Sequence, residues 1–329
     1  MSWMGTRVLV TGAGGFIGSH LTEALVEAGA TVTAMVHYRS TGTLGLLSLA
    51  PTAVRDAIRV VAGDLRDADA MAQATEGQEV VFHLGALIAI PYSYRHPADV
   101  VQTNVVGTLN ALMAARRAGV ARFVHTSTSE VYGTAQRVPM AETHPLSPQS
   151  PYAASKVGAD ALVTAFHRSY GLLAVTVRPF NTYGPRQSGR AVIPAIAAQA
   201  LRGSEIRLGA LTPTRDFTFV TDTVAGFLAL ARCDAALGRV VNLGSGQEVS
   251  IGALAERIRQ VVGRDVAIVS TAERLRPATS EVERLLGDAS EARALTGWGP
   301  RVALDEGLAR VVAFLRERPD WAAADRYEV

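Results

Sequence analysis

The stretch that decides the fold is Val8-Leu-Val-Thr-Gly-Ala-Gly-Gly-Phe-Ile-Gly18, close to the start of the chain. Its apolar first residues predict a short buried strand, and apolar positions recur at helical spacing from residue 17 to Ala28. Gly12, Gly15 and Gly18 lie between this predicted strand and the predicted helix. Glycine permits a tight turn and a close approach of strand and helix. The stretch therefore predicts a strand, a turn and a helix in direct succession.

The same alternation continues through the first half of the chain. A long helical stretch spans about 98–118, and further β-rich apolar runs lie at 31–36, 59–61, 80–84, 122–125 and 173–177. Continuous apolar strands separated by helices predict a parallel sheet that is covered on both faces. The predicted fold class is therefore α/β, a doubly wound parallel-sheet Rossmann domain.

The second half of the chain predicts a smaller, discontinuous α/β domain. A strand at 240–243 can rejoin the large sheet, while short strands alternate with helical segments near 193–201, 250–262 and 303–316. We therefore expect a cofactor-type domain from 1–177 plus about 218–245, and a substrate-type domain from about 178–217 plus 246–329.

The composition narrows the function classes. The chain has 329 residues, of which 48% are hydrophobic and 19% charged, and its formal net charge is +2. This balance gives no basic face for nucleic acid or a membrane surface, and the longest apolar run, about 80–90, is shorter than the ~20 residues of a membrane helix. The single Cys233 forms no disulfide within the chain, and the seven histidines show no metal-ligand spacing. We expect a soluble, cytoplasmic protein.

The glycine-rich turn predicts a dinucleotide site. A helix that begins after such a turn presents free N–H groups and its positive dipole end to a pyrophosphate, and an ordinary tight turn is the competing interpretation. Where a ribose-binding acid would end the second strand, the sequence reads Val36-His-Tyr-Arg39. Arg39 suits a 2′-phosphate, which favours NADP slightly, with NAD as the alternative. Asp64 and Leu65 end the third strand, where they would flank an adenine, and Asp64 is alternatively a helix cap.

Tyr152 and Lys156 are spaced one helical turn apart, after a proline that favours a helix start. An ammonium near a phenol favours the phenolate, so we expect Lys156 to lower the pKa of Tyr152 from its usual value of about 10. Such a phenol can accept the proton of a sugar hydroxyl while nicotinamide takes hydride from the same carbon. The competing interpretation is a pair on an exposed helix face.

Four motifs together resemble one family of enzymes. They are the glycine-rich 11–18 segment, Tyr152-x-x-x-Lys156, Arg178-Pro-Phe-Asn-Thr-Tyr-Gly-Pro185 and Arg215-Asp-Phe-Thr-Phe-Val220. In this order they are similar to the extended short-chain dehydrogenases/reductases that act on nucleotide sugars, over essentially the whole chain. The resemblance implies NAD or NADP, tightly bound and recycled, in the N-terminal domain, and a nucleoside-diphosphate sugar in the C-terminal domain.

The segment after the fifth strand narrows the resemblance. It contains Thr128-Ser-Glu130, and a glutamate there resembles the 4,6-dehydratases and also the glucuronate decarboxylases. Oxidation at C4 of the sugar acidifies the proton at C5, Glu130 would remove that proton, and the C6 hydroxyl would leave as water. The dTDP-glucose 4,6-dehydratases have an Asp-Glu pair where this chain has Ser129-Glu130, the pattern of the GDP-mannose enzymes. Two candidates therefore remain for the acid that protonates the leaving hydroxyl, Glu130 and water. A strand-end carboxylate satisfied by N–H groups is the other interpretation of Glu130.

Five further segments look like the 4,6-dehydratases of bacterial nonulosonate (legionaminic acid-type) and related deoxysugar pathways: 91–94, 150–156, 184–187, 190–193 and 276–281. They imply a GDP- or UDP-linked hexose or N-acetylhexosamine as substrate. The residues implied to be catalytic are Thr128, Ser129, Glu130, Tyr152 and Lys156. Those implied to bind the cofactor are Gly12, Gly15, Phe16, Ile17, Gly18, Arg39, Asp64, Leu65, Leu84, Ala86, Tyr152, Lys156 and Pro179. Those implied to bind the substrate, with arginines on the diphosphate, are Asn104, Asn181, Arg186, Val192, Arg215, Asn242 and Arg276.

The function that these observations favour is an NDP-sugar 4,6-dehydratase, which makes a 4-keto-6-deoxy sugar nucleotide. An NDP-sugar 4-epimerase and a UDP-glucuronate decarboxylase are the alternatives. A non-catalytic, NADP-sensing Rossmann protein is a remote one, because such proteins typically lack the Tyr/Lys pair. The resemblance also implies a homodimer that pairs the helices near 98–118 and 150–170 between subunits. No metal, nucleic-acid or membrane partner is expected.

Overall fold

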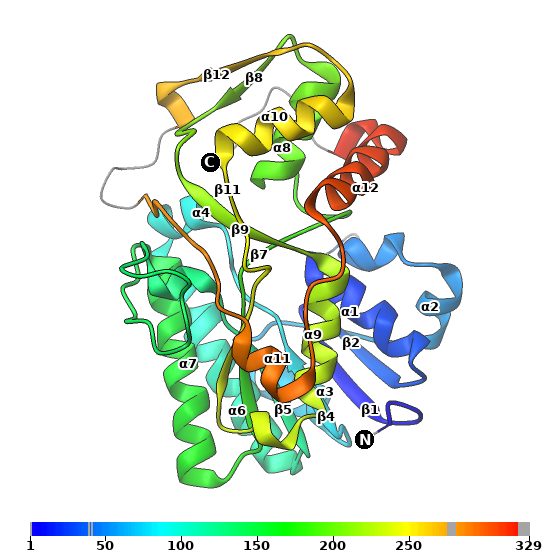
Figure 1. Ribbon diagram of the computed structural model, residues 1–329. Coiled ribbons are helices and arrows are strands. Elements are labelled where there is room, and N and C mark those ends of the chain that lie inside the picture. The colour runs from blue at the N-terminus through cyan, green and yellow to red at the C-terminus, as the bar shows by residue number, and fades with distance from the viewer. Residues whose placement is uncertain (1, 39, 41, 275–280, 322–329) are drawn as a thin grey trace.

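The centre of the molecule is a seven-stranded parallel sheet with the strand order β10-β6-β5-β4-β1-β2-β3 (Figure 1). The structure, a computed structural model, describes residues 2–38, 40, 42–274 and 281–321. The strands are β1 (Arg7–Thr11), β2 (Thr31–His37), β3 (Arg59–Gly63), β4 (Val80–His83), β5 (Arg122–Thr126), β6 (Ala174–Pro179) and β10 (Val240–Leu243). The strand order reverses between β1 and β4. In such sheets a ligand binds at the carboxyl ends of the strands beside this point.

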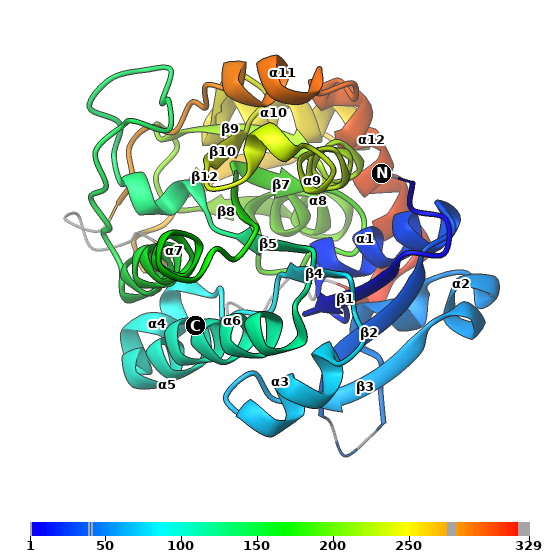
Figure 2. The same ribbon diagram turned by 90° about the horizontal axis from the view of Figure 1, so that it is seen from below.

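Helices cover both faces of the sheet (Figure 2). One face carries α3 (Ala68–Thr75), α6 (Gly107–Ala118) and α7 (Pro151–Tyr170), and the other carries α1 (Phe16–Glu27), α9 (Val220–Ala231) and α11 (Ser290–Thr296). Each face has its own core of buried aliphatic and aromatic side chains. The inner strands are largely apolar because side chains on both of their faces are buried, whereas the edge strand β3 is more exposed. The predicted doubly wound α/β fold is confirmed.

A smaller part of the molecule lies beyond the carboxyl ends of the strands, at the top of Figure 1. It contains a three-stranded sheet, β11-β9-β7, and a two-stranded sheet, β12-β8. Its strands are β7 (Asn181–Tyr183), β8 (Glu205–Leu208), β9 (Thr214–Phe219), β11 (Glu248–Ser250) and β12 (Ala267–Ser270). Its long helices are α8 (Val192–Arg202), α10 (Ile251–Val262) and α12 (Leu304–Glu317), which share a separate core.

Two chain segments cross between these parts. The strand β10 pairs with β6, so the expected return of 240–243 to the large sheet is confirmed. Helix α11 packs on α9 and β10, and Trp298 is buried in the same core as the sheet. We expected all of 246–329 in the smaller part. The segment around α11 lies instead on the large sheet, because its apolar face covers β10.

The predicted long helix at 98–118 is interrupted. Helix α5 (Pro97–Val101) runs into a π-helical turn at Gln102–Val106, and α6 follows. The wider turn changes the direction of its side chains relative to a regular helix, and it contains Asn104. The short helices α2 (Thr52–Ala57) and α4 (Ile90–Arg95) complete the N-terminal half.

Within the described residues, no helix is long and apolar enough to cross a bilayer. No group of three or more His, Cys, Asp or Glu side chains in this part of the chain is placed to hold a metal ion. Cys233 is a free thiol.

Candidate active site

The glycine-rich turn between β1 and α1 has the geometry of a phosphate-binding turn. Gly12 has a φ of +69°, in the left-handed region that favours glycine, and a Cβ on Gly18 would overlap the carbonyl oxygen of Gly12. Helix α1 begins at Phe16 after Gly15, and no side chain caps its first N–H groups. The residues therefore fit a dinucleotide pyrophosphate at this helix end.

The other predicted cofactor residues surround this turn at the carboxyl edge of the sheet. Leu84 and Ala86 follow β4, Leu65 follows β3, and Pro179 ends β6. A Cβ on Gly85 would lie only 2.8 Å from Cδ1 of Leu65, so the loops after β3 and β4 are in close contact. The structure thus brings these residues together along one edge. Ile17 lies in the first turn of α1.

Asp64 does not cap a helix. Its carboxylate accepts hydrogen bonds from the guanidinium of Arg66, at 2.6 Å from Nη2, and this contact lowers the pKa of Asp64. The cap of α3 is Asp67, whose Oδ1 accepts from the backbone N–H groups of residues 69 and 70. The alternative cap role for Asp64 is therefore wrong. Arg39 and Arg276 lie outside the described residues.

The predicted reacting pair lies on α7. Ser150 accepts a hydrogen bond from the N–H of Ala153, and Pro151 occupies the first turn, so the helix starts where the sequence predicted. Only 8% of Tyr152 and 4% of Lys156 is exposed. The pair therefore points inward, toward the sheet, rather than to an exposed helix face.

Burial determines the protonation of both groups. It raises the pKa of Tyr152 well above its usual value, against a hydrogen bond with Thr128 that lowers it, and the charge of Glu130 raises it further. Burial lowers the pKa of Lys156 to about 8. The expected lowering of the Tyr152 pKa by Lys156 is not found, because burial raises this pKa and Lys156 is not among the groups that act on it.

Thr128, Ser129 and Glu130 lie directly after β5. The Thr128 hydroxyl accepts a hydrogen bond of 3.2 Å from the N–H of Glu130 and caps the 3-10 turn Ser129–Tyr132. Ser129 is buried, whereas Glu130 is half-buried. In the part of the chain that the structure describes, no group donates a hydrogen bond to the Glu130 carboxylate. This favours a carboxylate that is available to a ligand over one satisfied by backbone N–H groups.

Three residues expected to bind substrate are engaged within the protein instead. Asn104, 1% exposed, accepts a hydrogen bond from the N–H of Leu87 and donates to the carbonyl of Leu87 and to Ser155. Its amide ties the loop after β4 to α7, beside Tyr152. Asn104 is therefore already hydrogen-bonded within the protein, and its predicted substrate contact stays a prediction.

Asn242 and Arg186 also have partners within the protein, and their predicted substrate contacts stay predictions. Asn242 is fully buried, accepts from Tyr132 Oη at 2.8 Å and donates to the carbonyl of Met140. Arg186 forms an ion pair of 2.7 Å with Glu23 on α1, where both side chains are largely buried. Its φ of +70° is unusual for a residue with a side chain, so its position is fixed by these contacts.

The remaining substrate candidates lie on the smaller part of the molecule. Asn181 on β7 is paired with Phe217 on β9, and Arg215 lies two residues before Phe217 on the same face of that sheet. Asn181 is half-buried and Arg215 is 7% exposed, with Nη2 3.3 Å from Oε1 of Glu281. Val192 begins α8. The structure thus brings Asn181 and Arg215 together.

Sequence reasoning missed a buried polar cluster behind Lys156. Asp160, one turn further along α7, contacts Arg178 on β6 at 2.8 Å and Ser127 at 2.7 Å. His125 on β5 lies 3.2 Å from Asp160 and stacks on His83 of β4. A signal was present: Tyr152, Lys156 and Asp160 follow one another at four-residue spacing, which places them along one stripe of the helix.

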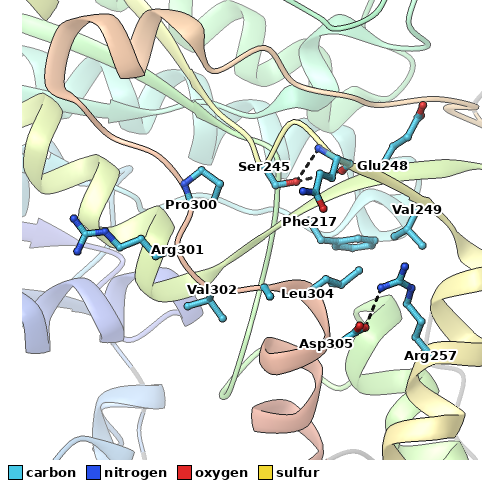
Figure 3. A pocket seen from close by; sticks show the side chains of 12 residues that line it. Phe217, Ser245, Glu248, Val249, Arg257, Pro300, Arg301, Val302, Leu304 and Asp305 are labelled. Atoms are coloured by element: carbon cyan, nitrogen blue, oxygen red, sulfur yellow. Dashed lines mark hydrogen bonds and ion pairs between the residues drawn. The ribbon is translucent and has the colours of Figure 1, made fainter.

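A separate pocket of about 380 Å³ lies on the smaller part (Figure 3). It is formed between β9, β11 and the start of α12, with Phe217, Val249 and Leu304 as apolar lining. At its rim, Arg257 forms an ion pair of 3.0 Å with Asp305. None of the predicted catalytic residues is among the residues that line it.

Comparison with known proteins places this arrangement among enzymes of nucleotide sugars. Residues 9–311 match the family model described as GDP-mannose 4,6 dehydratase. A UDP-glucose 4-epimerase of Mycolicibacterium smegmatis is 38% identical over 95% of this chain and 99% of its own length. A dTDP-glucose 4,6-dehydratase of Streptomyces niveus is 33% identical over 96% of this chain and 94% of its own.

The solved structures agree with the sequence relatives. A dTDP-glucose 4,6-dehydratase from Streptomyces venezuelae, solved with NAD bound, superposes with a TM-score of 0.86. It is 33% identical to this chain, and the match covers 96% of this chain and 99% of that one.

Proposed function

Because this chain belongs to the GDP-mannose 4,6-dehydratase family of extended short-chain dehydrogenases/reductases, we propose that it is an NDP-sugar 4,6-dehydratase. The observation that carries the proposal is the Glu130 carboxylate. It lies close enough to Tyr152 to raise the pKa of that phenol, and it has no hydrogen-bond donor from the described residues. An epimerase needs no base at C5, whereas a dehydratase does.

The residues have distinct roles in the proposed reaction. A bound nicotinamide supplies a reversible hydride acceptor for the sugar carbon. Thr128 hydrogen-bonds the O4 oxygen of the sugar, and Tyr152 accepts the proton of that hydroxyl as C4 is oxidised. Glu130 then removes the acidified C5 proton, and the C6 hydroxyl leaves as water. With hydride restored at C6 and a solvent proton taken up at C5, the product would be a 4-keto-6-deoxy sugar with no net redox change.

The cofactor and the substrate follow from the same site. The glycine-rich turn would hold the pyrophosphate of NAD or NADP through the N–H groups of Phe16, Ile17 and Gly18. Asn181 and Arg215 would meet the diphosphate of a GDP- or UDP-linked hexose or N-acetylhexosamine, since a guanidinium binds phosphate oxygens in pairs. Mass analysis of nucleotides that co-purify with the protein tests both assignments.

The deciding experiment is a product assay on a panel of GDP- and UDP-linked sugars. The proposal expects a product that has lost one water and carries a 4-keto group and a 6-methyl group by NMR. In heavy water, C5 of the product should carry deuterium, because the base exchanges its proton with solvent. An unchanged mass with inversion at C4 would falsify dehydration.

The second candidate is 4-epimerisation, because the 38% identical mycobacterial relative carries that name. Release of carbon dioxide from UDP-glucuronate would instead identify a decarboxylase.

We also propose a homodimer. Met113 on α6 and Tyr170 on α7 are large apolar side chains left exposed on the predicted pairing helices. The mass in solution tests this.

A further inference from the structure

Lys156 is the only lysine in a chain with 32 lysines and arginines together. Every other basic side chain of this kind is a guanidinium, which keeps its proton at any physiological pH. An amine can lose its proton, and burial lowers the pKa of Lys156 to about 8. The charge of the one titratable cation in the reaction centre therefore depends on its surroundings.

The group placed to preserve that charge is Asp160. It lies one helical turn after Lys156 on α7, with 5% of its surface exposed, and the proposed reaction gives it no role. Burial disfavours its ionised form, but His125, Arg178 and Ser127 offset this and lower the pKa of Asp160 to about 2. Asp160 is therefore a carboxylate at any pH at which the protein would work.

The hydrogen bonds of Asp160 are unevenly divided between its oxygens. Oδ2 accepts from Arg178 Nε at 3.2 Å, from Arg178 Nη2 at 2.8 Å and from Ser127 Oγ at 2.7 Å. Oδ1 lies 3.2 Å from His125 Nε2, in an orientation that does not complete a hydrogen bond. One oxygen thus anchors the carboxylate to β6, while the other faces His125 on β5.

We propose that Asp160 is a positioning residue of the reaction centre, a buried carboxylate fixed one helical turn from Lys156 that maintains its ammonium form. This rests on the proposed function only in so far as Lys156 acts in the reaction. Arg178 and Ser127 contribute to this role, because their hydrogen bonds hold the Asp160 carboxylate from the side of the sheet. Asp160 thereby joins the helix to β5 and β6.

The other charged or titratable groups around Lys156 do not replace Asp160. His83 on β4 and His125 on β5 are fully buried, and burial holds both of their pKa values below the usual range, so both are neutral. Arg178 on β6 carries the same charge as Lys156. Glu130 and Asp160 both raise the pKa of Tyr152, and Asp160 alone raises the pKa of Lys156.

The single lysine makes a direct test possible. Isotopically labelled lysine gives one side-chain NMR signal, from Lys156, and its titration needs no substrate. The wild-type midpoint should lie near pH 8. In Asp160→Asn it should fall by about one pH unit, because an opposite charge at this range is removed. At pH 8 the charged fraction then falls about fivefold, and the alkaline limb of the kcat profile should move by the same amount with KM unchanged.

Controls separate this effect from damage to the fold. Asp222→Asn removes another buried carboxylate, one that accepts from the N–H groups of Arg301 and Val302, and should leave the Lys156 midpoint unchanged. Asp160→Glu should restore most of the midpoint. If Asp160→Asn does not fold, the charge-balanced pair Asp160→Asn with Arg178→Met replaces it, since Arg178 does not act on Lys156 directly.

An unchanged midpoint in a folded variant overturns the proposal. A product assay that instead reveals an epimerase overturns the proposed function but leaves the titration result standing. The two failures are therefore distinguishable.

Discussion

Tyr152 and Lys156 lie one turn apart on α7, and burial moves their pKa values in opposite directions. A phenol held neutral by its surroundings is a poor base until a ligand changes the local field. Thr128 is the side chain whose hydrogen bond favours the phenolate. We therefore expect the phenol to stay protonated until substrate and cofactor bind.

Tyr152→Phe should reduce kcat about 10²- to 10⁴-fold, because it removes the group that accepts the C4 hydroxyl proton. Binding of the nucleotide sugar, measured by calorimetry, should change little. Tyr170→Phe, at the exposed end of the same helix, is the matched control and should keep full activity. Normal turnover by Tyr152→Phe would remove the phenol from the mechanism.

Glu130→Gln should separate the two halves of the proposed reaction. Oxidation at C4 does not need the carboxylate, so the ultraviolet absorbance of reduced nicotinamide should rise on mixing with substrate. Loss of water should slow about 10²- to 10⁴-fold, because the C5 proton has no base. Glu76→Gln, on the surface, is the control. Dehydration at the normal rate would show that another group is the base.

At the scale of elements, the turn between β1 and α1 tolerates little change in its glycines. Gly12 needs its positive φ, and Gly18 faces the carbonyl of Gly12 with no room for a side chain. The backbone of both residues also belongs to the expected pyrophosphate site. Packing of α1 on the sheet and binding of the cofactor are thus coupled through the same atoms.

Gly18→Ala should therefore abolish cofactor retention while the chain still folds, with a loss of stability of about 1–3 kcal/mol from overpacking. The control is Gly158→Ala in the interior of α7. There a Cβ would meet Val105 at 3.4 Å, an ordinary contact, and alanine favours a helix by up to about 1 kcal/mol. Cofactor content after purification and thermal unfolding measure the two outcomes. Full cofactor content in Gly18→Ala would contradict this account of the turn.

The order of strands and helices could be predicted from the sequence. The π-helical turn that interrupts the helix at 98–118 could not. Apolar periodicity gave the strands of the large sheet, because a strand buried on both faces is apolar at every position. It also predicted one helix over 98–118, since periodicity does not distinguish a π-helical turn from a regular one. That turn contains Asn104, whose partners Leu87 and Ser155 lie on two other segments.

At the scale of the whole molecule, the buried histidines make the fold sensitive to acid. Burial lowers the pKa of His20 and of His125 to about 4, from 6.5. Between these values the unfolded chain binds protons that the folded protein does not, so the free energy of unfolding falls as the pH falls. Asp160 adds a further loss between about 3.8 and 2, because its carboxylate is protonated in the unfolded chain first.

Urea unfolding should therefore show stability that decreases below about pH 7, by about 3 kcal/mol for each of these two histidines at pH 4. In His20→Asn the slope should be shallower, because the proton of His20 is no longer taken up on unfolding. A free energy of unfolding that does not change between about pH 7 and pH 5 would contradict the buried, neutral state of these side chains.

The sequence by itself determined the strand–turn–helix order, the glycine-rich turn and the spacing of Tyr152 and Lys156. These features depend on neighbours within a few residues, and backbone geometry fixes what such neighbours can form. Only the tertiary structure decided which polar side chains are free for a ligand. Asn104, Asn242 and Arg186 match the binding pattern in sequence, but each is held by partners from distant segments. The protonation states of Tyr152, Lys156 and Asp160 also depend on the tertiary structure. They follow from burial and from groups on β5 and β6, which come together only when the chain folds.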